Sequence, residues 1–596
     1  MIGNTQTLYR TLCRKKIFTA EETEPGKEKL RRVLNVFDLI ALGVGSTLGS
    51  GIYVLAGTVA KSIAGPAVVL SFVVAAIVSS FSGVCYAEFA GRVPKAGSAY
   101  IYSYVTVGEF IAFVIGWNLF IDNTIGTAAA GKAMANYLDA LLGDPQKTLM
   151  QKYYPIHLDY MGEYPDVAAF VFVMAVTVVL AWGVRQSSAL SSVFTTLNIL
   201  TVGTVIVSGF YFANPSNWFI RENEIPAGAA GGDGGFLPFG WTGVLVGAAR
   251  CFYGYIGFES IATTGDETKN PNKTIPLAIL FTLLFTTLAY AGVASVLTLM
   301  WPYYDQDPDA PLPVIYSNLG MPVIKYMVSC GAVFALLTTL LGCLFPTPRI
   351  LYAMSSDGLL FEFLSNVNEK TRTPITATLI CGFASAILSS IFDIEQLVEM
   401  SSIGTLISYS IVCICILILR YKNNSSTDVR DDEDINSEVL FFVKWFDNIA
   451  NAKIPNADTQ YVSRILILIY TVVAFVFCVC TVNVGNYKGV YQVPILATIM
   501  FTVAVLFMIM IMLNRLPQSI ENLTFKVPCV PLIPCLSIVL NLYLMMELNY
   551  KTWIRFGMGI IFGIFIYVMY GAQHSLEGRK QRALKVEDRK TPEISS

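Results

Sequence analysis

The chain has 596 residues, of which 54% are apolar and 14% are charged, and its formal net charge at pH 7 is −2. Ordinary soluble domains carry about 25% charged residues, so this composition indicates a membrane protein rather than a soluble one. A near-neutral charge also argues against a nucleic-acid partner and against an acidic substrate.

Runs of about 20 apolar residues recur along the whole chain, and each is long enough to cross ~30 Å of hydrocarbon. We therefore predict an all-α polytopic membrane protein with about fourteen transmembrane helices. In chain order, the predicted spans are residues 38–61, 66–90, 98–128, 165–183, 189–212, 240–265, 276–300, 321–347, 374–392, 397–420, 463–484, 491–513, 531–548 and 553–573.

The segments outside the spans predict the orientation of the chain. Lys and Arg are concentrated in the N-terminal segment 1–36, after spans 2, 6, 8 and 10, and in the tail 574–596. Cationic connections tend to stay in the cytoplasm, so we expect both termini there and a multi-pass protein of the plasma membrane. The N-terminal segment lacks a secretory signal, so span 1 would serve as an uncleaved one. An acid-rich cytoplasmic linker, 421–461, separates ten spans from the last four, 462–573.

Two of the predicted spans are interrupted by glycine near their centres. Span 1 contains the glycine- and serine-rich run 43–51, and span 6 has Gly254, Gly257 and Gly265 around an aromatic run. Lipid cannot hydrogen-bond a loosened backbone, so unwound helix at membrane depth survives only beside protein or a water-filled cavity. A matched pair of such breaks in two halves of a chain is typical of a transporter's substrate site.

The chemistry of a broken helix favours a zwitterionic substrate. The N–H groups at the start of a half-helix suit a carboxylate, and the carbonyls at the end of the facing half-helix suit an ammonium group. An α-amino acid carries both groups on one carbon. A second interpretation remains open, because Gly45 and Gly49 have the GxxxG spacing of closely packed helices.

Several longer strings resemble the animal cationic amino acid transporters, a group within the amino acid–polyamine–organocation superfamily. They are residues 44–57, 86–89, 92–100, 108–119, 251–253, 261–267, 270–271, 348–349, 352–360 and 402–406. The resemblance implies a LeuT-like fold, with inverted five-helix repeats at 37–212 and 238–420, spans 1 and 6 broken, and four C-terminal helices. It also implies transport of cationic L-amino acids such as arginine, lysine and ornithine.

The resemblance also assigns roles to residues at the two breaks. It implies that N–H groups of Gly49, Ser50 and Gly51 bind the substrate carboxylate. Carbonyls of Thr47, Tyr253 and Ile256 would bind the α-ammonium, with Gly257 marking the break in span 6. Tyr253 matches the family's aromatic gate; the alternative is a tyrosine that packs or faces lipid.

Ionisable residues inside a membrane are functional hypotheses by default. Glu109 and Asp122 both lie on span 3, but about 20 Å apart along a helix, so they cannot both touch one small substrate. Asp122 is the more direct candidate for contacting a cationic side chain, with a fixed ion pair as its alternative. Glu109 could instead tie span 3 to its neighbours, and Glu259 could cap backbone amides at the second break. Glu88 is expected to be structural.

Arg250 differs from what a carrier of cationic substrates would need, and Asn198 differs from what a proton-coupled carrier would have. Arg250 lies one turn outside Tyr253, where a fixed cation would repel arginine or lysine unless a carboxylate neutralised it. We expect Asp122 as its partner, which would leave a pocket better suited to neutral amino acids. Asn198 occupies the span 5 position at which proton-coupled relatives carry Lys. Because Asn cannot titrate, we expect facilitated diffusion without an obligatory ion.

The predicted function is therefore alternating-access uniport of amino acids, most directly cationic ones, driven by membrane potential. The alternatives are a neutral amino acid carrier of the same fold and a receptor that binds amino acids without transporting them. An enzyme is disfavoured, because His157 and His574 both lie outside the spans and no metal-ligand spacing appears. We expect no cofactor and no metal, an amino acid and the lipid bilayer as partners, and leave the oligomeric state open.

Overall fold

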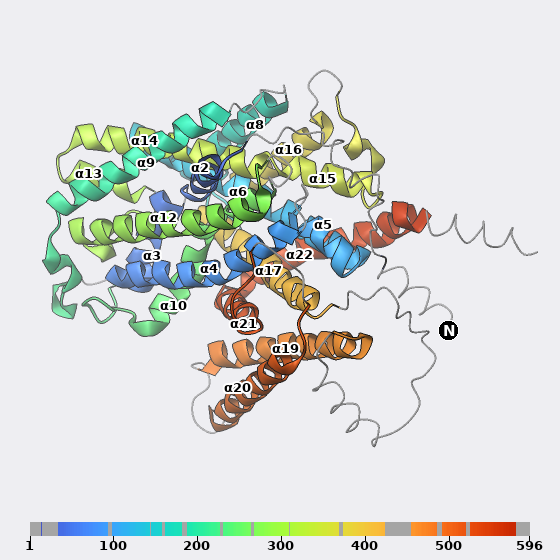
Figure 1. The fold of residues 1–596 in the computed structure, drawn as a ribbon. Helices are drawn as coiled ribbons and strands as arrows, with labels where there is room; N and C mark the ends of the chain where they lie inside the picture. Colours follow the sequence, from blue (N-terminus) through green and yellow to red (C-terminus); the bar gives the residue numbers. More distant parts are fainter. Residues whose placement is uncertain are drawn as a thin grey trace, which may run out of the picture.

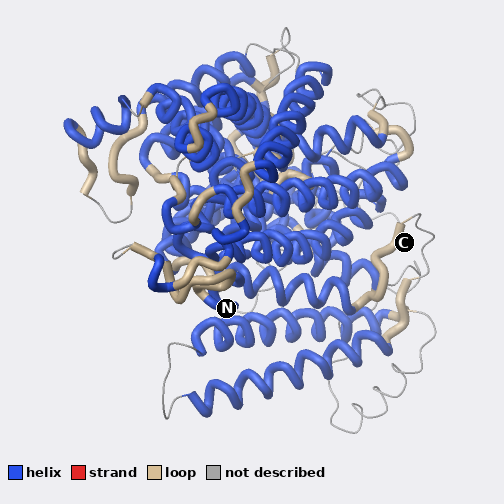
Figure 2. Tube along the Cα trace, turned by 90° about the vertical axis from the view of Figure 1, so that its left-hand side faces the viewer, coloured by secondary structure: helices blue, strands red, loops and turns tan. Residues whose placement is uncertain are grey.

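A computed structural model describes residues 14, 34–49, 51–92, 98–143, 145–157, 161–181, 188–226, 231–263, 268–308, 310–368, 374–422, 455–484, 492–519 and 525–579. Within these residues the chain is helical, and its only β pairing is two isolated bridges, Leu34–Thr268 and Arg221–Gly234. Figure 2 shows the helices packed side by side. Ser50, Gly265, most of segment 1–36, most of the linker and the tail beyond Arg579 lie outside the described residues.

Each predicted span contains apolar helix within the described part of the chain. Spans 1–10 correspond to α2 (Val36–Thr47) with η2 (Gly51–Leu55), α3 (Ala56–Val59) and η3 (Ala60–Ala64); α4 (Val68–Arg92); α6 (Glu109–Leu142); α8 (Val167–Ala181); α9 (Ser188–Tyr211); α10 (Gly240–Cys251) with η7 (Phe252–Tyr255) and α11 (Glu259–Thr263); α12 (Pro271–Met300); α14 (Pro322–Leu344); α16 (Ile375–Ile391); and α17 (Ile394–Arg420). Spans 11–14 correspond to α19 (Ala457–Asn483), α20 (Gln492–Arg515), α21 (Leu532–Met546) and α22 (Tyr550–Ile566), which continues into η13 (Tyr567–Gly571) and α23 (Ala572–His574). Shorter connecting helices are α5 (Ser98–Thr106), α7 (Pro145–Tyr153), α13 (Pro311–Asn318) and α15 (Thr347–Ser356).

Nine helical stretches among the described residues are long and apolar enough to cross a membrane, and α2, α8, α16 and α21 are shorter apolar helices. The prediction of an all-α polytopic membrane protein is confirmed. The predicted third span, 98–128, is wrong at its start. Gly108, with φ 145°, separates α5 from α6, so the span begins at Glu109 and runs to Leu142. Gly108 and Glu109 interrupt the apolar run only briefly, which concealed this turn.

The first ten spans pair in a symmetrical way. Helix α4 packs against α12, α6 against α14 and α8 against α16, so spans 2, 3 and 4 each contact the span five places later. In the same way α17 packs on α6 while α9 packs on α14. Figure 1 shows these long helices lying side by side. Each contact thus has a counterpart in which the first and second sets of five spans swap roles, as two related five-helix repeats would produce.

The C-terminal helices attach to the core mainly through span 10. Helix α21 packs on α17 and α4, and α22 packs on α17 and α6. Helices α19 and α20 pack on each other at the lower edge of Figure 1, with α19 also contacting α21.

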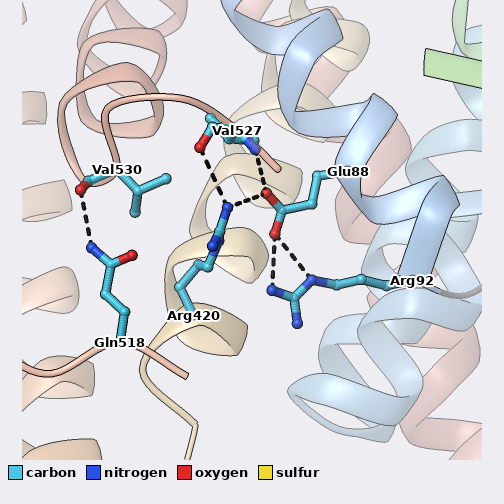
Figure 3. Close-up of polar contacts among 6 residues, drawn as sticks. All are labelled: Glu88, Arg92, Arg420, Gln518, Val527 and Val530. Carbon is cyan, nitrogen blue, oxygen red and sulfur yellow. Dashed lines mark hydrogen bonds and ion pairs between the residues drawn. The ribbon is translucent and has the colours of Figure 1, made fainter. Parts of the chain in front are cut away.

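A buried charge cluster joins α4, α17 and the segment before α21, as Figure 3 shows. Glu88 accepts hydrogen bonds from Arg92 (Nη2, 2.9 Å), from Arg420 (Nη2, 2.7 Å) and from the backbone N–H of Val527 (2.6 Å). Glu88 and Arg420 are both buried. The geometry supports the structural role expected for Glu88, because its Oε2 joins α4 to Arg420 of α17 and to the segment before α21, while its Oε1 pairs with Arg92 on α4 itself.

Candidate substrate site at two helix breaks

The first break separates α2 from η2. Helix α2 ends at Thr47, Leu48 leaves the helical region with ψ 75°, and helix resumes only at Gly51. The Gly49 N–H donates to the carbonyl of Thr47 (2.9 Å), which closes a tight turn between the two halves. At the start of η2 the Ile52 N–H donates to the carbonyl of Gly49 (3.2 Å), so the turn residue also accepts from the second half of the span.

The second break lies between α10 and α11. Helix α10 passes into the 3₁₀ turn η7, Ile256 is extended with ψ 136°, and Gly257 has φ 125°. Residues with a side chain rarely adopt this φ, so the turn requires glycine. The Glu259 carboxylate accepts a hydrogen bond from the Gly257 N–H (2.9 Å), which is the capping role considered for it.

The two breaks touch each other although about 200 residues separate them. A Cβ added to Gly51 would lie 2.7 Å from the Cα of Gly254. A Cβ added to Gly257 would lie 2.9 Å from the carbonyl carbon of Ser46. The glycines at the contact between spans 1 and 6 therefore allow the two loosened backbones to meet directly.

Close packing also explains the other glycines of span 1. A Cβ on Gly45 would lie 2.4 Å from Thr195 Oγ1 of α9, and one on Gly49 would lie 2.1 Å from Thr339 Oγ1 of α14. Close packing is therefore confirmed at Gly45 and Gly49, and the substrate-site interpretation of the run stays a prediction. Gly45 and Gly49 accommodate neighbouring helices, whereas Gly51 lies at the contact between the breaks.

Side chains from spans 5 and 7 hold the broken backbone. Asn198 Nδ2 donates to the carbonyl of Leu48 (2.6 Å), and its Oδ1 accepts from the Tyr53 hydroxyl (2.6 Å). One amide side chain therefore bonds residues on both sides of the break in span 1. The Tyr290 hydroxyl on α12 lies 2.9 Å from the carbonyl oxygen of Thr47 and 2.8 Å from that of Gly254.

Tyr290 is one residue of this site that sequence reasoning missed. It lies in an otherwise apolar stretch of span 7, where tyrosine resembles any other aromatic residue. One signal was available, because a buried tyrosine hydroxyl usually finds a hydrogen-bond partner.

Two of the three carbonyls assigned to the substrate ammonium already accept protein donors in this conformation. Thr47 accepts from Gly49 and Tyr290, and the carbonyl of Tyr253 accepts from the Ile256 N–H (3.1 Å). A carbonyl oxygen has two lone pairs, so a substrate would share or replace these donors. The side chain of Tyr253 is buried, which excludes the lipid-facing alternative.

Two of the predicted acidic residues lie against one stripe of hydroxyls on α17. Asp122 accepts from Ser401 Oγ (2.5 Å) and from Thr405 Oγ1 (2.5 Å). Glu259 accepts from the Tyr409 hydroxyl (2.8 Å) one turn further along. Spacing of four residues places Ser401, Thr405 and Tyr409 on one helical face. Spans 3 and 6 thus present carboxylates to the same side of span 10.

Glu109 lies in a separate cluster. Its carboxylate accepts from the hydroxyls of Tyr104 (3.1 Å), Tyr567 (3.1 Å) and Ser575 (2.5 Å), and pairs with Arg14 at 3.8 Å. These partners come from α5, η13 and the two terminal segments. The arrangement supports the interpretation of Glu109 as a tie between span 3 and its neighbours.

Arg250 has different partners from the one expected. It pairs with Glu395 and, through Nη2, with Glu399 Oε1 at 3.0 Å, both on the first turns of α17. The predicted pairing with Asp122 is wrong, because Asp122 bonds the hydroxyls of Ser401 and Thr405, which follow these glutamates along α17. A small cavity beside this ion-pair cluster is also lined by Val54 and Thr58. Two carboxylates face one guanidinium there, so the fixed cation is neutralised without Asp122.

Among the described residues, no group of three or more His, Cys, Asp or Glu side chains could hold a metal ion. The site instead combines polar backbone at two facing breaks with the buried carboxylate of Asp122 and the partly buried carboxylate of Glu259. A many-spanning helical protein built in this way belongs to the class of secondary carriers.

Comparison with known proteins agrees with this class. Residues 34–430 match the family model described as "Amino acid permease", and residues 525–575 match "C-terminus of AA_permease". The chain is 34% identical to human "Cationic amino acid transporter 4" and 35% identical to its mouse counterpart, covering 93% of this chain and 89% of each relative. It is 33% identical to "Cationic amino acid transporter 4, vacuolar" of Arabidopsis thaliana, over 92% of this chain and 93% of the relative.

The chain therefore belongs to the amino acid permease family, as a transporter of the cationic amino acid transporter type. It is an integral multi-pass membrane protein that transports amino acids and is not an enzyme. The predicted family resemblance is confirmed.

Proposed function

We propose that this carrier transports cationic L-amino acids such as arginine, lysine and ornithine by alternating access. The observation that carries the proposal is the pair of carboxylates on one face of α17, Asp122 of span 3 and Glu259 at the break in span 6. Among the described residues, their hydrogen-bond partners are hydroxyls and a backbone N–H rather than cations. A buried carboxylate without a cationic partner is costly, so a cationic substrate side chain would supply what the protein does not.

The proposed mechanism is uniport without an obligatory ion. Asn198 donates a permanent amide hydrogen bond to the Leu48 carbonyl, so a neutral group holds the first break at every pH. The membrane potential would still drive a cationic substrate inward, by ~2.3 kcal/mol per 100 mV or roughly 50-fold accumulation.

Voltage-clamped cells expressing the carrier test this proposal. We expect arginine, lysine and ornithine to produce inward currents that grow with negative voltage, whereas leucine and glutamine compete weakly. Replacing sodium, or changing external pH at fixed voltage, should leave arginine uptake unchanged. Uptake that disappears without sodium, or that follows the proton gradient at constant voltage, contradicts uniport.

Arg250 is the feature that favours a neutral amino acid carrier as the second candidate, because it lies on the outer access route. Its two glutamates weaken that argument, since the cluster of Arg250, Glu395 and Glu399 has more carboxylates than cations. Opposite charge at the mouth of a route raises the local concentration of a charged substrate.

We expect Arg250→Thr to raise arginine uptake relative to leucine uptake by several-fold, because both glutamates then face the route without a cation. Tracer uptake of both amino acids in the same cells gives the ratio. Arg221→Thr is a suitable control, since Arg221 is an exposed arginine in the segment before α10. An unchanged ratio in Arg250→Thr would show that Arg250 does not influence selectivity.

The receptor alternative predicts binding without flux. Measuring labelled arginine binding and uptake in one reconstituted preparation separates a receptor from a carrier. On the distribution of Lys and Arg between the connections, we propose that both termini lie in the cytoplasm. We propose the plasma membrane as the location, which this distribution does not address. Named plant relatives are vacuolar and mitochondrial, so the location of tagged protein in cells is the direct test.

A further inference from the structure

Tyr290 connects the two breaks, although it belongs to neither broken span. Its side chain is buried, and its hydroxyl lies 2.9 Å from the carbonyl oxygen of Thr47 and 2.8 Å from that of Gly254. Thr47 ends the inner half of span 1, and Gly254 belongs to the loosened turn of span 6. One hydroxyl thus lies within hydrogen-bond distance of two backbone carbonyls, one at each break.

We infer that the Tyr290 hydroxyl replaces the substrate ammonium in the empty carrier, and so allows the carrier to change orientation without substrate. This inference rests on the proposed uniport and adds a residue that makes uniport possible. A uniporter must return empty, whereas an exchanger crosses the membrane only when loaded.

The argument begins with the acceptors. Buried carbonyls need donors, and lipid supplies none. In the loaded carrier, an ammonium group offers three donors to the carbonyls around it. When the substrate leaves, those carbonyls keep a donor only if water or the protein provides one. A closed, water-excluding intermediate without substrate therefore needs a donor from the protein.

The surroundings of Tyr290 hold its hydroxyl at this position. Its ring stacks on Phe72 of α4, with ring centroids 4.8 Å apart and planes 3° apart, and lies 5.3 Å from the ring of Tyr255. A Cβ on Gly51 would lie 2.5 Å from the Tyr290 hydroxyl, and one on Gly254 would lie 3.1 Å from it. Glycine at both breaks leaves the space that the hydroxyl occupies.

The chemistry also explains why a substrate would displace this hydroxyl. A phenol has one proton to divide between two carbonyls, whereas an ammonium group has three protons and a full charge. Charged donors form hydrogen bonds roughly twice as strong as neutral ones. The hydroxyl is therefore a sufficient partner for the empty site and a weaker one than the substrate.

The Tyr290→Phe variant should affect the empty carrier and not the loaded one, because it keeps the ring and removes only the hydroxyl. We expect net arginine uptake into arginine-free vesicles to fall about tenfold or more, since the empty carrier returns with the Gly254 carbonyl unsatisfied and with only the Gly49 N–H left on the Thr47 carbonyl. Arginine–arginine exchange, in which the carrier crosses loaded in both directions, should remain within about twofold of the wild-type rate.

Purified Tyr290→Phe protein should also bind labelled arginine more tightly, because the ammonium no longer competes with a hydroxyl. A purely structural tyrosine would weaken binding instead, so this measurement remains informative if transport is low. Tyr255→Phe is the matched control. It removes a neighbouring buried hydroxyl that donates to the carbonyl of Phe72 (3.0 Å) and to neither break, so its ratio of exchange to net uptake should match the wild type.

The outcomes are distinct. Net uptake and exchange that fall equally in Tyr290→Phe, or arginine binding that becomes weaker, overturn the inference. Wild-type protein that binds arginine but shows neither net uptake nor exchange would refute the proposed carrier itself.

Discussion

Replacing Gly257 by alanine is expected to reduce amino acid uptake at least about 30-fold while the protein still reaches the membrane. Gly257 has φ 125°, where a side chain is strained at a cost of ~1–3 kcal/mol. The added Cβ would also lie 2.9 Å from the backbone carbon and oxygen of Ser46. Overpacking of this kind costs another ~1–3 kcal/mol, and backbone atoms cannot rotate away as a side chain would.

The measurement is initial-rate tracer uptake, normalised to the amount of protein at the cell surface. Gly203→Ala is the matched control, because a Cβ at Gly203 on α9 would meet nothing within 4 Å. Alanine at Gly203 should leave uptake unchanged. Uptake within twofold of wild type in Gly257→Ala would show that the contact between the breaks is not needed for transport.

Replacing Glu88 by glutamine is expected to destabilise the whole protein. The change leaves Arg92 and Arg420 without their carboxylate, and Arg420 is buried. Removing one member of a buried ion pair costs ~3–5 kcal/mol, because the remaining charge is left uncompensated. Glutamine keeps one acceptor oxygen, for which Arg92, Arg420 and the Val527 N–H would compete, so the contact of the segment before α21 with α4 and α17 should weaken.

Thermal unfolding of the purified protein in detergent measures this effect as a lower midpoint temperature. The double variant Glu88→Ala with Arg420→Ala should lose less stability than the two single variants added together, because neither charge remains to be compensated. Glu163→Gln is the control, since Glu163 pairs with Gln151 at an exposed position. A Glu88→Gln protein that unfolds at the wild-type temperature would contradict a stabilising role for the cluster.

The amino-acid sequence was sufficient to predict the spans and the two breaks, because both depend on local properties. Apolar runs of membrane-crossing length are visible without a fold, and so is glycine within them. The capping role considered for Glu259 also follows from local spacing, as its carboxylate bonds an N–H only two residues away. The start of span 3 was missed because Gly108 and Glu109 interrupt an apolar run only briefly.

The partners of Arg250 and the role of Tyr290 depend instead on contacts between helices that are distant in the chain. Arg250 meets glutamates about 145 residues later, and several carboxylates were equally plausible from their sequence positions alone. Tyr290 bridges Thr47 and Gly254 only because spans 1, 6 and 7 converge there.

The sequence by itself determined that this chain is a helical membrane carrier with two interrupted spans, because helix length and helix breaking are properties of short segments. Tertiary structure decided which groups satisfy the interrupted backbone and which charges neutralise each other. Hydrogen bonds and ion pairs act over only a few ångströms, so packing of the helices selects their partners.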